Sequence, residues 1–205
     1  MKALNHLRTI NRHKMVVMKH CFKVGLYKQG LLHDLSKYTP TEFLVGCRYF
    51  QGTRSPNNAE REATGYSSAW LHHKGRNKHH YEYWIDYSTT PGEGIVGLKM
   101  PTKYVVEMVM DRIAASKIYN GAAYTDRDPL NYYEKSAKQL GKMMHPETAE
   151  LLHKTIQGLN SQAYTALLKA STFFLYFLYI HPPYTTEATQ NAILPAYLHE
   201  LSQSH

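Results

Sequence analysis

Residues 102–121 read "TKYVVEMVMDRIAASKIYNG", and this stretch predicts a long helix that ends at Gly121. Five of its side chains recur at helical spacing, and four of the five are apolar or aromatic: Tyr104, Met108, Asp111, Ala115 and Ile118. This stripe predicts a helix face in the core, so Asp111 is expected to face inward. A buried aspartate can pair with a buried arginine, cap a neighbouring helix or bind a metal, and this stretch alone leaves these alternatives open.

Outward from this helix, start and stop signals favour helices along most of the chain. No stretch alternates with period two, and residues 52–60 and 88–101 read as loops. The sequence therefore predicts an all-α fold, with one domain over residues 1–160 and a helical extension over 161–205. In the first half of the chain, one helix is expected over about residues 3–27, ending near "KQG", and a short one carries "LLHDLSKY" (31–38). A third helix is expected to begin at a capping box formed by Thr39 and Glu42, and a fourth runs through Trp70 and His73 and ends at "KGRN" (74–77). Two more are expected over residues 128–140 and 145–156.

Composition limits the class of protein. The chain has 205 residues, a net charge of +8 and two cysteines whose spacing suits neither a metal site nor a disulfide framework, so we expect a reducing, cytoplasmic location. The apolar run at 166–180 is interrupted by Lys169 and is shorter than the roughly 20 residues of a membrane span, so no membrane partner is expected. The positive charge fits a solvated surface, an anionic ligand or nucleic acid.

The stretch "LLHDLSKY" places His33 and Asp34 directly after two leucines, where a helix is expected to enter the core. Burying an unpaired carboxylate costs several kcal/mol unless a cation or strong donors meet it. The adjacent pair therefore predicts a partner for both side chains, and a metal ion is one that would suit them.

Two histidine doublets stand in "LHHKGRNKHHYEYW" (71–84), together with three cationic side chains. Surface histidines, a basic and aromatic nucleic-acid patch, and metal ligation all fit this composition. Two nitrogens on one metal lie at most about 4.2 Å apart, whereas seven residues of helix span about 10.5 Å. His72 and His79 could thus share a metal only if "KGRN" turns the chain, and otherwise they would serve neighbouring metals. By the same test, at most one of His6, His13 and His20 reaches a given metal.

These segments together resemble the HD-domain superfamily of metal-dependent phosphohydrolases, in an uncharacterised bacterial branch. The stretch "LLHDLSK" is similar to the central motif of that superfamily, including Lys37, and "HKMVV" (13–17) is similar to its first motif. The stretch "VMDRIAASKIY" (109–119) resembles the closing motif, and "LHHKGRNKHH" (71–80) resembles the histidine doublets of the two-metal branches. The resemblance covers about residues 10–120.

The resemblance implies an HD-domain-like helical bundle with a C-terminal helical appendage, holding one or two divalent transition metals (Fe, Mn, Ni or Zn). It implies hydrolysis of a small phosphate ester, with nucleotides among the candidates, by water activated on the metal. Asp34 would bridge two metals, and His20 is a rival of His13 as the first ligand. The implied metal ligands are His13, His33, Asp34, His72, His79 and Asp111; the implied catalytic residues are Asp34 and Lys37; the implied substrate-binding residues are His73, Lys74, Arg76, Lys78 and His80.

Two other functions fit the same residues. Some HD folds carry a di-iron oxygenase site, which the same ligands would serve, and a non-catalytic nucleotide- or nucleic-acid-binding protein with a vestigial site would keep the pattern. Nucleic acid is not the favoured partner. The C-terminal helices would be available for a homo-oligomer.

Overall fold

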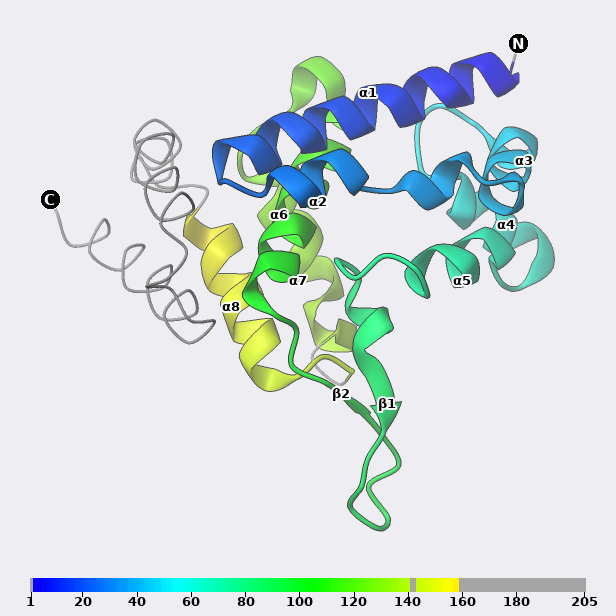
Figure 1. The fold of residues 1–205 in the computed structure, drawn as a ribbon. Helices are drawn as coiled ribbons and strands as arrows, with labels where there is room; N and C mark the ends of the chain where they lie inside the picture. Colours follow the sequence, from blue (N-terminus) through cyan, green and yellow to red (C-terminus); the bar gives the residue numbers. More distant parts are fainter. Residues whose placement is uncertain (1, 141–142, 159–205) are drawn as a thin grey trace, which may run out of the picture.

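The computed structural model describes residues 2–140 and 143–158, and these residues form a helical protein with one short two-stranded ribbon (Figure 1). The all-α prediction is confirmed for this part of the chain. The expected extension over 161–205, and an oligomer formed through it, lie outside the described residues. The elements are α1 (Lys2–Lys23), α2 (Tyr27–Leu32), η1 (Leu35–Tyr38), α3 (Pro40–Tyr49), α4 (Pro56–Thr64), α5 (Ser68–Lys74), η2 (Tyr81–Trp84), β1 (Ile85–Tyr87), β2 (Ile95–Gly97), α6 (Thr102–Asn120), η3 (Gly121–Ala123), α7 (Asp128–Leu140) and α8 (Pro146–Gly158).

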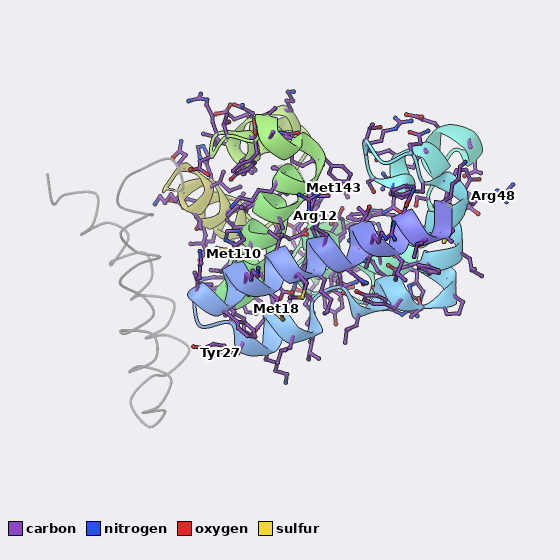
Figure 2. The ribbon with its side chains drawn as sticks, turned by 90° about the horizontal axis from the view of Figure 1, so that it is seen from above. Arg12, Met18, Tyr27, Arg48, Met110 and Met143 are labelled. Carbon is purple, nitrogen blue, oxygen red and sulfur yellow. The ribbon has the colours of Figure 1, made fainter. Side chains whose placement is uncertain are left out.

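The core forms around α6, which ends at Gly121 as the sequence predicts. This helix packs against α1, α7 and α8, and Val105 and Val109 on it are fully buried. Figures 1 and 2 show α1 crossing the molecule, with α3 to α5 gathered beside its N-terminal half and α6 to α8 beside its C-terminal half. The side chains of α1 therefore reach both groups of helices, and those of α6 reach α1 from the core.

The first helix ends earlier than the sequence predicts. It stops at Lys23, where Gly25 takes a φ of +75°, and the "KQG" segment lies inside α2 instead. Gly30 is buried where α2 packs on α1, and a β-carbon there would lie 3.0 Å from Cys21 Cβ. That glycine permits close helix packing rather than ending a helix, and the distinction depends on tertiary contact.

Three other local predictions were wrong in detail. The expected loop at 52–60 contains the first half of α4, so the segment that leads to His73 holds two helices, α4 and α5, rather than one. The stretch "LLHDLSKY" is not one helix, because the chain breaks at His33 and Asp34 between α2 and η1. The expected loop at 88–101 contains β2, which pairs antiparallel with β1 in the register Ile85 with Gly97 and Tyr87 with Ile95. Strands of three residues are too short to show alternation.

No helix in the part of the chain that the structure describes is long and apolar enough to cross a membrane.

Candidate metal centre

The break between α2 and η1 turns His33 and Asp34 toward α6. Asp34 has a φ of 55°, the one positive φ among the described residues other than glycine. A left-handed residue costs on the order of 1 kcal/mol, and aspartate tolerates it better than most side chains. Lys14 of α1 fixes this break, because its Nζ donates to the backbone oxygens of Leu31 and His33 at 2.8 Å each. The chain thus holds both side chains in a defined direction.

A first group of potential ligands joins α1, the break and α6: His13, His33, Asp34 and Asp111. Nε2 of His13 lies 2.9 Å from Asp111 Oδ1, and Nε2 of His33 lies 3.5 Å from the same oxygen. Oδ2 of Asp34 lies 3.3 Å from His33 Nε2 and 3.9 Å from His13 Nε2. One ligand atom from each residue lies within 4.8 Å of the others, so a single ion could contact all four. Asp111 faces this group, as expected, but the prediction that its stripe lies in the core was wrong, because Met108 is buried whereas Tyr104, Asp111, Ala115 and Ile118 are half-buried.

A second group joins the same aspartate to the histidine doublets: Asp34, His73, His79 and His80. The other carboxylate oxygen, Asp34 Oδ1, lies 3.2 Å from His73 Nε2 and 3.3 Å from His79 Nε2. Nε2 of His73 lies 2.9 Å from Nε2 of His80. These rings can meet because the chain turns after α5, where Asn77 Nδ2 donates to the backbone oxygen of His73 at 2.8 Å. The turn expected at "KGRN" is present, and Asp34 belongs to both groups.

Two buried glutamates orient the histidine rings. Glu107 Oε1 accepts from Nδ1 of His33 at 3.0 Å and of His79 at 3.1 Å. Glu42 Oε2 accepts from Nδ1 of His73 at 2.8 Å. A carboxylate on Nδ1 places a ring proton there, so each Nε2 faces Asp34 and offers its lone pair to a metal when it is deprotonated. This arrangement of carboxylate, histidine and central site is typical of metal centres.

The central atoms have charged neighbours but few hydrogen bonds. His13 Nε2 lies 2.9 Å from Asp111 Oδ1, and Lys37 Nζ lies 2.6 Å from Asp34 Oδ2. The Nε2 atoms of His13, His33 and His79 and both carboxylate oxygens of Asp34 are nevertheless buried, and within the described residues none makes a hydrogen bond of regular geometry. Buried polar atoms normally find hydrogen-bond partners. A cation at the centre would satisfy nitrogen lone pairs and carboxylate oxygens at once. The residues therefore fit a metal ion in chemistry as well as in spacing.

Electrostatics keep the shared carboxylate ionised. Burial raises the pKa of Asp34, but the charges of His33, Lys37 and His73 outweigh burial and hold that pKa well below its usual value. Burial lowers the pKa of Lys37, yet Asp34 and Asp111 raise it more, so its ammonium stays charged 2.6 Å from Asp34 Oδ2. Burial and the neighbouring imidazoles of His79 and His73 hold the pKa of His80 well below normal, so His80 is neutral as a ligand must be.

Residues 2–158 match the sequence profile of DUF5662, a family of unknown function. The chain belongs to DUF5662. No curated protein and no solved structure matches it. The HD-domain resemblance is a separate observation, which this family membership does not test, and it stays a prediction.

The structure of this DUF5662 chain places His73 in the second group of ligands, whereas His72 lies outside the groups of potential ligands in the described residues. His72 Nδ1 instead donates to Glu42 Oε1 at 2.7 Å. His20 also lies outside the groups, since its Nε2 is 3.2 Å from Lys117 Nζ, whereas its rival His13 lies within the first group. The structure thus brings together His13, His33, Asp34, His79 and Asp111 from the predicted ligand set, and it adds His73 and His80, which were expected to bind substrate.

Sequence reasoning missed both glutamates. Glu42 read as the third residue of a capping box, but Thr39 makes no side-chain cap on α3, and its Oγ1 donates to the backbone oxygen of Ser36 instead. The helix begins where the sequence predicts, with Thr39 before it and Pro40 at its first position, but the side-chain bonds of a capping box are absent because the Glu42 carboxylate is bonded to histidines. Glu107 lies one helical turn before Asp111, so the spacing along α6 could have revealed it.

A cavity of about 740 Å³ opens beside the centre, and His13, Lys37, His73, His80 and Asp111 all line it. The predicted substrate cations Lys74, Arg76 and Lys78 are not among the lining residues. Arg76 Nη1 donates to the backbone oxygen of His72, and Lys78 Nζ lies over the rings of Tyr83 and Tyr104. The cationic side chains that do line the cavity are Lys37, Arg54, Arg61 and Arg112.

Proposed function

We propose that this DUF5662 chain is a metal-dependent hydrolase of a phosphate ester, with nucleotides among the candidate substrates. One observation carries the proposal: two groups of histidine and carboxylate ligands share Asp34 and border one cavity. A closed structural metal site would have no need of an adjoining cavity, because structural sites surround the ion with protein ligands. The resemblance to the HD-domain phosphohydrolases points the same way.

The proposed ligand set divides between two divalent ions. His13, His33 and Asp111 would hold one ion, His73, His79 and His80 the other, and Asp34 both. Mixed imidazole and carboxylate donors suit Fe, Mn, Ni or Zn, and affinity order does not choose among them. A bound ion of this kind lowers the pKa of water toward 7 and neutralises a phosphoryl oxygen.

The chain's own residues would do the remaining work. Glu107 and Glu42 fix the direction in which the imidazoles point. Lys37 lies at the cavity wall against Asp34, where its charge could bind a phosphoryl oxygen. The cavity volume falls within the roughly 300–1,000 Å³ of small-molecule sites, large enough for a nucleotide. Trp70 and Tyr81 line the cavity and offer aromatic surface to a base.

The test begins with protein purified without a histidine tag. Elemental analysis should find at least one transition metal per chain, and Asp34→Ala should lose it, because that change removes the carboxylate common to both groups. Asp86→Ala is the control, since Asp86 is exposed on β1. The metal-loaded protein is then tested on a panel of phosphomonoesters and phosphodiesters.

Two results would overturn the proposal. If Asp34→Ala keeps the metal content of the wild type, the metal centre proposed around Asp34 is refuted. A loaded protein that hydrolyses no ester but consumes oxygen with an organic substrate would point to an oxygenase.

A further inference from the structure

Arg112 is an enclosed cation that the proposed metal chemistry does not use. It follows Asp111 on α6 and lines the same cavity. Its Nη1 is buried without a hydrogen-bond partner in the described part of the chain, and Nη2 has only Met108 Sδ, at 3.9 Å. Burying a charge costs several kcal/mol unless a counter-ion is close.

No carboxylate of the described residues lies within ion-pair distance of Arg112. Asp111 contacts His13 on α1, whereas the guanidinium of Arg112 lies 5.7 Å from the ring centroid of Tyr132 on α7. Neighbouring residues on a helix point about 100° apart, so the two side chains reach different parts of the cavity wall. Arg112 is therefore placed apart from the metal ligands.

A second arginine lines the same cavity without a carboxylate partner within ion-pair distance in the described part of the chain. Arg61 lies over the Trp70 ring at 5.6 Å, and its Nη1 donates to Asn58 Oδ1. Arg54 differs, because it is paired with both oxygens of Glu62.

Glu82 also lines this cavity. Glu82 lies beyond ion-pair distance of either arginine, so neither guanidinium is neutralised by direct contact with it.

We propose that Arg112, assisted by Arg61, forms a second anion-binding position in the cavity, which takes a phosphate group remote from the metal centre. A guanidinium offers parallel N–H donors that match two phosphate oxygens, and the guanidinium of Arg112 lies within cation–π distance of the Tyr132 ring. The substrate class that fits is an ester with two phosphate groups, one at the metals and one at Arg112. The role in substrate choice rests on the proposed function, whereas the anion site itself does not.

The anion site is tested first without metal. The full-length chain is stripped of metal and titrated with inorganic phosphate by calorimetry, in parallel with Arg112→Met, Arg112→Lys, Arg76→Met and Arg48→Met. Wild type should bind phosphate saturably, Arg112→Met at least about tenfold more weakly, and Arg112→Lys in between because it keeps the charge but loses the paired donors. Arg48→Met should bind as wild type, because Arg48 is exposed on α3 and projects away from the body of the molecule (Figure 2).

The outcomes separate the site from the proposed function. Absence of saturable phosphate binding by the wild type overturns the inference, and so does unchanged binding in Arg112→Lys and in folded Arg112→Met. Loss in Arg76→Met with none in the Arg112 variants would also overturn it and favour the sequence-based assignment. If phosphate binds through Arg112 but the loaded enzyme hydrolyses no ester, the anion site stands and the hydrolase proposal fails. If it does hydrolyse esters, Arg112→Met should lose a preference for bisphosphates over monophosphates.

Discussion

Glu107→Gln is the change that tests most directly whether the imidazoles are held for a metal. One oxygen of Glu107 accepts from Nδ1 of both His33 and His79, at 3.0 and 3.1 Å. Burial raises the pKa of Glu107, but the hydrogen bonds from the two histidines outweigh burial and lower it, so the group is ionised. Glutamine keeps the shape and one acceptor oxygen but removes the charge that makes the two Nε2 atoms basic.

Loss of such a carboxylate typically costs 10- to 100-fold in metal affinity, which corresponds to about 1.4–2.8 kcal/mol. We expect Glu107→Gln to raise the Kd for Zn²⁺ within that range, measured by competition with a chelating indicator. Glu60→Gln is the matched control, because Glu60 is also buried but accepts from Ser67 and Ser68 at the start of α5 and from no histidine. It should lower stability while leaving the Kd within about twofold. Equal Kd values for Glu107→Gln and wild type would refute the role of Glu107.

Two further predictions concern the remaining histidines. His73→Ala should lower the metal stoichiometry, whereas His72→Ala should preserve it because the His72 ring contacts Glu42 instead of Asp34. If elemental analysis finds equal loss of metal in both variants, His72 belongs to the ligand set. His20→Gln should keep its metal and flatten the fall in unfolding free energy between pH 6.5 and 4 in urea titrations. Burial, helped by the charge of Lys117, lowers the pKa of His20 from 6.5 to about 4. Between these pH values the unfolded chain binds more protons than the folded chain, so the stability present above pH 6.5 is lost as the pH falls toward 4. If the variant shows the same slope of unfolding free energy against pH as the wild type, the prediction is wrong.

Helices were predictable where the signal is local. Asp128 and Pro146 stand in the first turns of α7 and α8, and Gly121 ends α6, as the sequence predicts. The end of α1 was not predictable in the same way. Gly25 and Gly30 look alike in sequence, yet one bends the chain with a positive φ and the other permits α2 to contact Cys21. Only the packing of the two helices distinguishes these uses of glycine.

The residue types of the candidate site were predictable from the sequence, but the direction in which each helical side chain points was not. Consecutive residues on a helix point about 100° apart, so His72 and His73 on α5 must present their rings differently. His79 and His80 lie between α5 and η2, and both belong to the second group. Glu42 accepts from Nδ1 of both His72 and His73, but only the second ring carries its Nε2 to Asp34. The sequence could not show which ring this is, because the answer depends on the position of α5 against α3.

The balance of charge explains why a cationic cavity suits this centre. Asp34, Asp111, Glu42 and Glu107 contribute four negative charges and Lys37 one positive charge, while histidines that bind metal are neutral. The protein groups alone thus carry three negative charges, and one divalent ion would leave one. A second ion would turn the total to one positive charge in a buried setting, where an unneutralised charge is costly. On the proposed ligand set, a phosphate ester supplies the missing negative charge, and Arg112 and Arg61 on another part of the cavity wall extend the same attraction along the cavity.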